Sequence, residues 1–324
     1  MKKILVAAVA ALSFALPSLT SLSASAADKV QVDITQIVAH PALDAVRKGV
    51  EDYLEQQGYK KGENLTINFQ SAQGNIPTAT QIARQFVGEE PNVIVAIATP
   101  SAQTMAATTK EIPIVFSAVS DPVEAKLVAS LDKPGANVTG VSDRSPVDEH
   151  IKLLKEIFPD LKNIGYLYNA GEANSVSNLK LLEEVAKANN INVIPSSASK
   201  ASDVQAATRS LLGKVDVIYV PTDNMIISVL EGVSVVALES QTPLFTADAS
   251  SIGRGPFAAQ GINYYDAGLE TGKLVERILK GEKPADIAVT TPPAKDISID
   301  LKAAEKLGVT VPQAVIDRAA KVIR

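Results

Sequence analysis

Short apolar runs alternate with longer amphipathic stretches along the first half of the chain. Runs rich in β-branched residues occur at 29–38, 65–69, 93–98 and 114–118. Stretches with apolar residues three and four positions apart follow the first three runs, at 42–57, 78–87 and 101–109. The runs predict strands, and the spaced pattern predicts helices with one apolar face. Together they predict a parallel sheet covered by helices on both faces.

The second half repeats this order. After a strand at 137–141, Ser145 and Pro146 predict the start of a helix with an apolar face of Val147, Ile151, Leu154 and Phe158. Strands follow at 164–168, 192–195, 217–220, 244–246 and 258–262, with helices at 177–188, 203–212 and 226–238. The predicted helix at 267–279 and the tail from 295 are additional to the repeated pattern of the second half. We therefore expect the chain to return to the first half near Asn263. No long Pro- or Ser-rich linker separates the halves, which favours a short hinge of several strands.

The first 26 residues have the pattern of a cleavable export signal. Lys2 and Lys3 precede an apolar run at 4–16, and small residues at 24–26 provide a cleavage site. The run is shorter than the roughly 20 residues that a membrane-spanning helix requires. The chain has no cysteine to carry a lipid. We therefore expect a soluble, unanchored mature protein in the periplasm of a Gram-negative bacterium.

Composition narrows the classes of function. Of 324 residues, 46% are hydrophobic and 21% are charged, as in a globular protein of two domains. With no cysteine and two histidines, disulfides and thiolate sites are excluded and a histidine metal site is disfavoured. The net charge of −5 argues against a nucleic-acid partner, because that affinity depends on clustered Lys and Arg. We expect no metal and no cofactor.

Small polar residues follow most of the predicted strands. In a parallel sheet the carboxyl ends of the strands share one edge, where open α/β folds bind ligands, and two such edges facing each other would form a polar cleft. Each residue could instead cap the next helix, and the string DPVE at 121–124 fits such a cap. The charged members are all acidic, which suits a zwitterionic ligand. The residues are Thr99, Ser101, Ser120, Asp121, Asn174, Ser175, Asp223, Asn224 and Asp248.

No catalytic motif is supported by its context. The string GRGPFA at 253–258 has the letters of a dinucleotide fingerprint but precedes a strand, whereas that motif must open a helix. The string GLETGK at 268–273 is one residue too short for a phosphate-binding loop. His40 has no nucleophile elbow to serve, and His150 lies off the apolar face of its helix, where we expect it in solvent. We therefore predict no catalytic residues.

Six strings carry a resemblance that runs through nearly all of the mature chain. They are TQIVAHPALD at 35–44, AVSDPV at 118–123, NVTGVSD at 137–143, YNAGEANS at 168–175, YVPTDN at 219–224 and GINYYDAG at 261–268. On these strings the chain resembles an ABC-transporter substrate-binding family, whose members of known specificity include binders of tryptophan and phenylalanine. The turn at 254–257 departs from the family pattern and leaves the size of the pocket open.

The resemblance implies a type I periplasmic-binding-protein fold of class α/β: two lobes, each a doubly wound parallel sheet with helices on both faces, joined by a three-crossing hinge. The boundaries expected are a signal peptide at 1–26, an N-terminal lobe at 27–143 plus 265–287, and a C-terminal lobe at 144–264 plus 288–324. The resemblance also implies a monomer that captures an amino acid, aromatic or otherwise apolar, and delivers it to a permease driven by an ATPase subunit. The alternatives are an exported sensor and a two-lobed enzyme acting on a small polar metabolite.

The strand ends and the resemblance together suggest roles for individual residues. We expect Ser101, with the backbone around Ala102 and Gln103, and Ser120 to hold the ligand's carboxylate. Asp223 or Asp248 should hold its ammonium group, and Asn174, Ser175 and Asn224 should complete the second lobe's share. His40 and Pro41 would border the side-chain pocket. Asp143 could belong either to this site or to the hinge.

Overall fold

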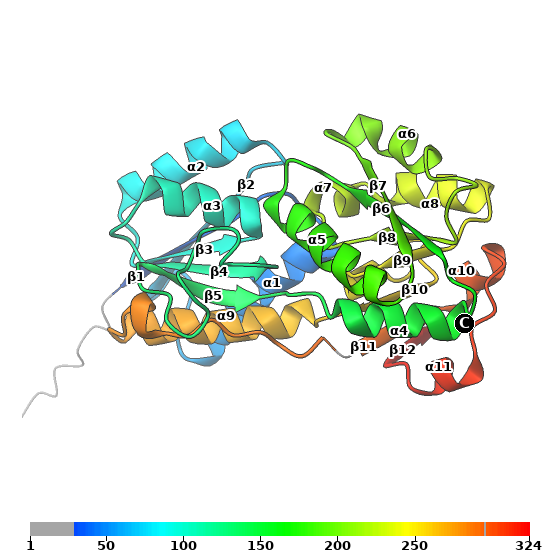
Figure 1. The fold of residues 1–324 in the computed structure, drawn as a ribbon. Helices are drawn as coiled ribbons and strands as arrows, with labels where there is room; N and C mark the ends of the chain where they lie inside the picture. Colours follow the sequence, from blue (N-terminus) through cyan, green and yellow to red (C-terminus); the bar gives the residue numbers. More distant parts are fainter. Residues whose placement is uncertain (1–28, 295) are drawn as a thin grey trace, which may run out of the picture.

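The structure, a computed structural model, describes residues 29–294 and 296–324. The expected export signal lies outside the described residues. Two lobes lie side by side, each with its own sheet and hydrophobic core (Figure 1). This arrangement confirms the predicted α/β class with two lobes and largely parallel sheets.

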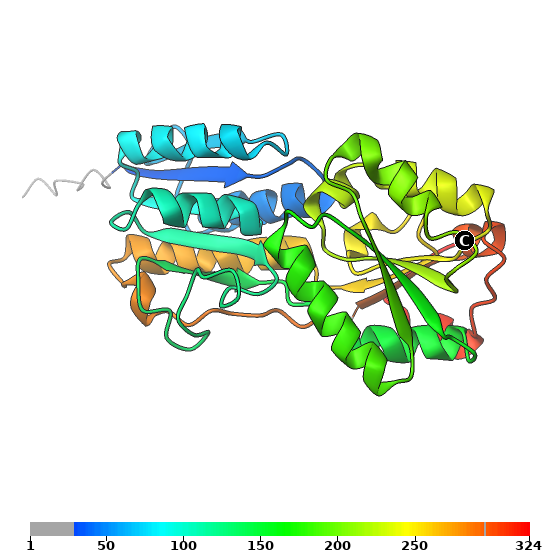
Figure 2. The same ribbon diagram turned by 45° about the horizontal axis from the view of Figure 1, so that its top comes forward.

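The first lobe is built on an entirely parallel sheet in the order β2-β1-β3-β4-β5. Helices α2 and α3 lie on one face, and α1 and α9 on the other (Figures 1 and 2). Strands β3 and β4 are buried along their whole length, which accounts for their continuous apolar sequence. The elements are β1 (Val30–Gln36), α1 (Pro41–Gln56), β2 (Leu65–Ser71), α2 (Ile76–Glu89), β3 (Val93–Ile97), α3 (Thr99–Thr108), β4 (Ile114–Val119), β5 (Val138–Ser142), α9 (Tyr264–Leu279) and the short helix η3 (Pro284–Asp286).

Helix α9 belongs to the first lobe although it follows the second lobe in sequence. Its apolar face, including Leu274 and Val275, is buried in the first core. Helices α1 and α9 approach backbone to backbone at Gly49 and Gly268, because a methyl group on either glycine would overlap main-chain atoms of the other helix. Asn263 caps α9 by accepting the N–H of Tyr265 at 3.0 Å. The chain therefore returns to the first lobe at this residue.

The second lobe has a sheet in the order β12-β11-β10-β9-β8-β6-β7. Its core strands are parallel, but β11 runs antiparallel to β10 and so ends the parallel series. The strands are β6 (Asn163–Tyr168), β7 (Asn192–Ser197), β8 (Val217–Val220), β9 (Leu244–Thr246), β10 (Ala258–Gly261), β11 (Asp296–Asp300) and β12 (Lys321–Ile323). The helices are α4 (Val147–Ile157), α5 (Ala173–Ala188), η1 (Ala201–Asp203), α6 (Val204–Arg209), α7 (Asn224–Ser228), α8 (Leu230–Glu239), η2 (Ala249–Ser251), α10 (Leu301–Lys306) and α11 (Gln313–Asp317).

The chain crosses between the lobes three times. The first crossing joins β5 to α4, and the second joins β10 to α9. The third follows Thr290, which still pairs with the first lobe: its N–H donates to the carbonyl of Gly140 at 3.1 Å, and its own carbonyl accepts from Ser142 at 2.8 Å. The first lobe thus extends a few residues beyond the expected boundary at 287.

Three local expectations were wrong. His150 is fully buried, and its Nδ1 lies 2.7 Å from the hydroxyl of Tyr219. Burial lowers the pKa of His150 to about 3, so its neutral ring packs as a core aromatic. The helix expected at 226–238 is broken at Val229, whose backbone is not helical. Ser145 does not cap α4, because the N-cap residue is Pro146 and no side-chain cap is made.

Candidate functional site

A small cavity lies between the lobes. About 10 Å³ of it is open to a water-sized molecule, roughly the space that one water needs and far below the roughly 300–1,000 Å³ typical of small-molecule pockets. Strand ends and hinge segments of both lobes contribute to its wall. The lining residues are His40, Leu43, Ala118, Asp143 and Tyr264 from the first lobe and its hinge, and Thr222, Asp223, Asn224, Ile227 and Asp248 from the second. In this arrangement of the lobes, the side chains of the two walls nearly fill the cavity.

The second lobe's wall is a network of completed hydrogen bonds around Asp223. Its Oδ1 accepts the N–H of Ile226 (2.8 Å), and its Oδ2 accepts the N–H of Asn169 (2.6 Å) and the hydroxyl of Ser175 (2.6 Å). Burial, and secondarily the charge of Glu172, raises the pKa of Asp223 to about 7. The carboxyl group therefore caps α7 as well as facing the cavity.

Glu172 is a buried carboxylate that the sequence did not single out. Its Oε2 accepts the N–H (3.1 Å) and the side-chain amide (2.6 Å) of Asn224, and also the amide of Asn174 (3.2 Å). Its Oε1 accepts the N–H of Met225 at 3.0 Å. Its position shortly after β6, within the string YNAGEANS, was the feature of the sequence that could have indicated a role in the site. Glu172 fixes the side chains of Asn174 and Asn224 at the edge of the cleft.

The first lobe contains buried polar atoms without partners at the carboxyl edge of its sheet; His40 lines the cavity, whereas Thr99 and Ser101 are not among its lining residues. Within the described part of the chain, neither ring nitrogen of His40 and neither hydroxyl of Thr99 and Ser101 is hydrogen-bonded. Thr99 and Ser101 are each 1% exposed and stand in the first turn of α3, whose N–H groups also lack intrahelical carbonyl partners. Leaving such groups unpaired costs about 1–3 kcal/mol each. These atoms form a set of donors and acceptors suited to an anionic guest at a helix N-terminus.

Two residues with a strained backbone lie at the same edge of the first sheet. Ala98, between β3 and α3, has φ of 75°, and Ala118, beside a register shift in β4, has φ of 55°. This left-handed region costs a residue other than glycine about 1 kcal/mol or more. The N–H of Ala98 donates to Ser117 at 2.9 Å, which holds the two strained residues close together. Such strain is typical of a functional edge.

Asp143 and Ser120 connect the first lobe to the hinge and to the second lobe. Asp143 accepts the hydroxyls of Ser120 and Tyr264, each at 3.0 Å. The Ser120 hydroxyl also lies 3.1 Å from that of Thr222 across the cleft. Asn178 donates to Thr222 at 3.0 Å and so orients it from α5. Tyr264 and Thr222 were not among the predicted site residues; the hinge brings Tyr264 there, and Thr222 follows β8 of the second lobe.

A polar latch closes one rim of the cleft. We use this name for Asp121 and Glu124 of the first lobe with Ser177 and Lys180 of α5. Lys180 pairs with Glu124 at 2.6 Å, and Ser177 donates to Asp121 at 3.4 Å. Asp121 also accepts the N–H of Glu124 at 2.9 Å, so it caps a turn, and it pairs with Arg144 at 3.5 Å. Asp121 therefore lies at the rim of the cleft and does not line the cavity.

The other predicted residues are divided between the cavity and its surroundings. Asp248 lines the cavity, but its oxygens accept the N–H and hydroxyl of Ser250 and the hydroxyl of Ser251. Gln103 donates to the carbonyl of Ala125 at 3.2 Å, and Ala102 is buried beneath it. Pro41 is exposed at the start of α1 and is absent from the cavity lining.

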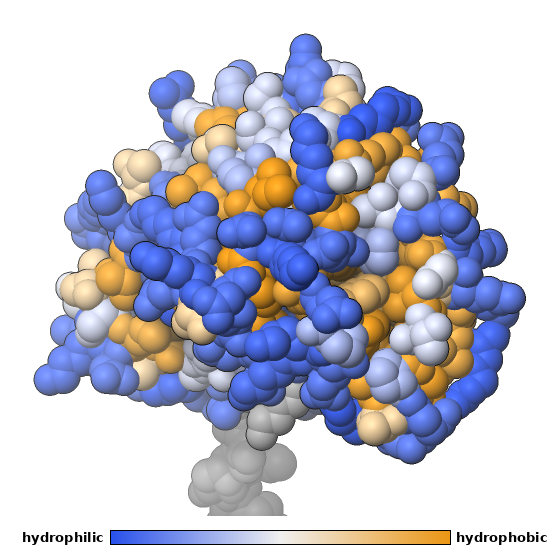
Figure 3. Space-filling model, turned by 45° about the vertical axis from the view of Figure 1, so that its right-hand side comes forward, coloured by the Kyte–Doolittle hydropathy of each residue, from blue (hydrophilic) through white to orange (hydrophobic). Residues whose placement is uncertain are grey.

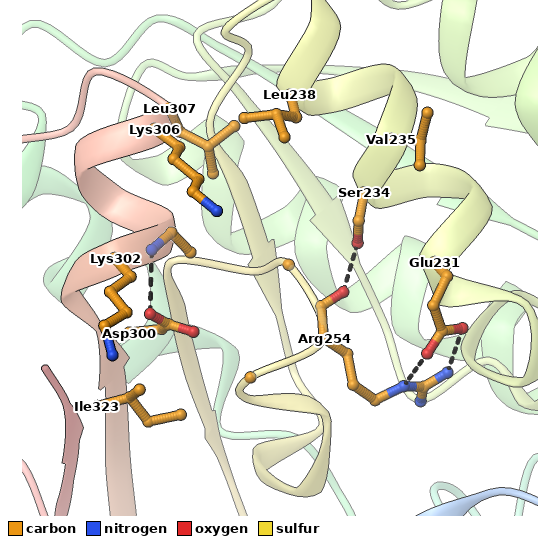
Figure 4. A pocket seen from close by; sticks show the side chains of 13 residues that line it. Glu231, Ser234, Val235, Leu238, Arg254, Asp300, Lys302, Lys306, Leu307 and Ile323 are labelled. Carbon is orange, nitrogen blue, oxygen red and sulfur yellow. Dashed lines mark hydrogen bonds and ion pairs between the residues drawn. The ribbon is translucent and has the colours of Figure 1, made fainter.

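A second hollow lies on the outer face of the second lobe, between α8 and α10 (Figure 4). Val235 and Leu238 are 49% and 43% exposed there, and Figure 3 shows apolar residues between charged ones on this side of the molecule. Arg254 makes a two-point ion pair with Glu231 at 2.7 and 2.9 Å. None of the predicted site residues lines this groove, so it is separate from the cleft.

Among the described residues, no group of His, Asp and Glu side chains is arranged to hold a metal ion. None of the helices in the described ranges has the length and apolar character needed to span a bilayer.

The fold, the polar cleft and the sequence define a substrate-binding protein. The chain belongs to the family described as ABC transporter substrate binding protein, which it matches over residues 31–323. It is 44% identical over 269 residues to a protein of Clostridioides difficile (strain R20291) named tyrosine-binding protein, covering 83% of this chain and 78% of that one.

Two solved structures bear on the arrangement of the lobes. The chain is 34% identical to an ABC domain from Streptococcus pneumonia in complex with L-Trp, covering 91% of this chain and all of that one, with a TM-score of 0.89. It is 41% identical to a ligand-free, open substrate-binding protein with adhesive properties from Clostridium difficile, covering 91% and 99%, with a TM-score of 0.69. The more distant sequence gives the better superposition, so the lobes here are placed as in the tryptophan complex.

Proposed function

We propose that this protein binds an aromatic amino acid between its lobes and presents it to an ABC importer. The observation that carries the proposal is the set of unpaired buried atoms of His40, which lines a cavity walled by carboxylates, and of Thr99 and Ser101 in the first turn of α3, at the carboxyl edge of the same sheet. Unpaired polar atoms are costly unless a partner arrives, and a zwitterion supplies both an anion and a cation. The names of two relatives, one for tyrosine and one for a tryptophan complex, support an aromatic side chain.

The carboxylate of the ligand binds at the start of α3. The hydroxyls of Thr99 and Ser101 donate to it, together with the N–H groups of these two residues in the first helical turn; the N–H of Ala102 donates to the carbonyl of Ala98 instead, at 3.1 Å. Ser120 stands at the end of the neighbouring strand and completes this side of the site. The ammonium group lies toward the acidic side chains of the cavity wall.

The side chain of the ligand lies toward His40 and Leu43. Burial lowers the pKa of His40, so its ring is neutral and carries one donor and one acceptor nitrogen. A phenol hydroxyl can serve as both acceptor and donor to such a ring, which favours tyrosine among aromatic amino acids. Asn174, Ser175 and Asn224 shape the opposite wall from the second lobe.

Closure of the lobes is the functional step. A ligand that touches both lobes stabilises the closed arrangement by the contacts that form only on closure. The protein leaves its ligand chemically unchanged. In this role it works as a monomer in the periplasm after removal of residues 1–26, and it docks on a permease with a separate ATPase subunit.

Thermal unfolding of the mature protein against all amino acids, sugars and nucleosides tests this function. A ligand at 100 times its dissociation constant adds about 2.7 kcal/mol of stability. We expect tyrosine to raise the unfolding temperature most, with smaller effects of tryptophan and phenylalanine, and recovery of the ligand unaltered. Stabilisation by sugars alone would contradict an amino-acid site.

A further inference from the structure

Asp143 stands where the hinge, the cavity and the first lobe meet. It follows β5 at the first crossing, is 5% exposed and lines the cavity. Its Oδ1 accepts the hydroxyl of Ser120, and its Oδ2 accepts the hydroxyl of Tyr264, each at 3.0 Å. Tyr264 is the first residue of α9, just after the second crossing. One carboxylate therefore joins two of the three hinge segments.

The three cavity carboxylates differ in their remaining capacity to accept hydrogen bonds. A carboxylate offers about four lone-pair sites. Asp223 accepts three hydrogen bonds from the protein, and Asp248 also accepts three. Asp143 accepts two from side chains. It therefore has the most room for donors supplied by a guest.

The charge of Asp143 is not balanced by a cation of the protein. Among the described residues that line the cavity there is no Lys or Arg. The adjacent Arg144 pairs with Asp121 instead, at 3.5 Å. Burial, with a further contribution from the charge of Asp248, raises the pKa of Asp143 to about 6 despite its two hydroxyl donors. The environment of the carboxylate thus favours a cationic partner.

We propose that Asp143 accepts the ammonium group of the bound amino acid and, through Tyr264, transmits occupancy of the cavity to the hinge. The proposal rests on the proposed function and refines it. An ammonium group has three donors, and the open lone pairs of Asp143 can receive two of them. Because Tyr264 holds the other side of the same carboxylate, fixing Asp143 against the ligand also fixes the two crossings relative to each other.

The test compares an amino acid with its deaminated analogue. Calorimetry on the full mature chain measures the affinity for L-tyrosine and for 3-(4-hydroxyphenyl)propionate, or for L-tryptophan and indole-3-propionate if tryptophan binds better. We expect Asp143→Asn to weaken amino-acid binding by about 10–100-fold, the range for a hydrogen bond to a charged group. Binding of the analogue should change by less than about threefold, because the analogue has no ammonium group to lose.

Two further variants keep the test decisive. Tyr264→Phe removes one hydroxyl and should weaken amino-acid binding about fivefold without affecting the analogue, which provides an answer even if Asp143→Asn folds poorly. Asp248→Asn is the matched cavity control, and its effect on amino-acid binding should be several-fold smaller than that of Asp143→Asn. Equal losses for both ligands in the Asp143 and Tyr264 variants would show a purely structural role and overturn the proposal, as would unchanged amino-acid affinity. Failure of the unmodified protein to bind any amino acid would instead refute the proposed function.

Discussion

The polar groups at the facing edges of the two lobes differ in their hydrogen bonding. On the first lobe, the hydroxyls of Thr99 and Ser101 and the ring of His40 are buried without partners in the described chain. On the second lobe, Asp223 and Glu172 accept hydrogen bonds from backbone and side-chain groups of neighbouring residues in the same lobe. The first lobe therefore gains more from a guest, although in the described ranges the second lobe also has one unpaired buried atom at the cleft, the Oδ1 of Asn174. We infer that the first lobe supplies most of the affinity and the second serves as a preformed lid.

The largest expected effect is on affinity, from the first lobe. The double variant Thr99→Val with Ser101→Ala removes two donors to the ligand carboxylate, each contributing about 1.5–3 kcal/mol. Affinity for tyrosine should fall about 100-fold or more, while the unfolding temperature stays the same or rises, because no hydrogen bond within the protein is lost. Calorimetry and thermal unfolding check the two halves of this expectation. Thr108→Val, a hydroxyl on the same helix that donates to Thr104, is the control.

Asp223 of the second lobe should contribute to the pH dependence of stability, alongside Asp33 and Asp143, whose pKa values burial raises to about 6. The pKa of Asp223 is raised to about 7 in the folded protein from an ordinary value of 3.8. Its contribution to stability is thus fully present below about pH 3.8 and is lost as the pH rises through about 7, at about 1.4 kcal/mol per unit of raised pKa. Urea unfolding of the ligand-free protein should show this decrease. Asp223→Asn should make the curve flatter between about pH 4 and pH 7, and an unaltered slope there would refute the assignment.

A single hydroxyl on the second lobe should affect folding more than binding. Ser175→Ala removes a 2.6 Å hydrogen bond to the buried Asp223. The free energy of unfolding should fall by about 1–3 kcal/mol, because a buried carboxylate loses a donor. Tyrosine affinity should change only a few-fold. Ser196→Ala, a partly exposed hydroxyl on β7, provides the comparison. A large loss of affinity at unchanged stability would erase the distinction between the lobes.

The smallest effect should come from the polar latch between the lobes. Lys180 and Glu124 are 63% and 54% exposed, and exposed ion pairs contribute about 0–1 kcal/mol. Glu124→Gln should therefore weaken binding by less than about fivefold, and salt should reduce the difference between variant and parent. Affinity measured at low and high ionic strength decides this. A tenfold or larger effect would mean that the latch, and not the cavity walls, determines closure.

Local sequence patterns were sufficient for most elements of the fold. The strands at 217–220 and 244–246 were predicted with their observed ends, because apolar runs bounded by polar turns leave little choice of boundary. The break at Val229 was missed because its neighbours have helical apolar spacing throughout. His150 was misplaced because a neutral histidine that bonds a buried tyrosine looks, in sequence, like a polar surface residue.

The sequence predicted only those site residues that directly follow strands. Asp223, Asn224 and Asp248 follow strands and line the cavity, as that logic requires. Tyr264 and Asp143 meet only because two hinge crossings run side by side, which no spacing in the sequence encodes. The unpaired state of Thr99 and Ser101 also depends on the packing around them. The sequence could therefore indicate which residues lie near the site. It could not show which of them are free to bind a ligand and which are already hydrogen-bonded within the protein.

The glycine contact between α1 and α9 has a consequence for dissecting the molecule. Residues 29–143 contain every strand of the first sheet but lack α9, whose buried Leu274 and Val275 complete that core. A fragment ending at 143 would leave the apolar side of α1 uncovered and should aggregate. Supplying residues 264–290 as a separate peptide should restore it, so the first lobe is a natural candidate for a split, two-piece reporter.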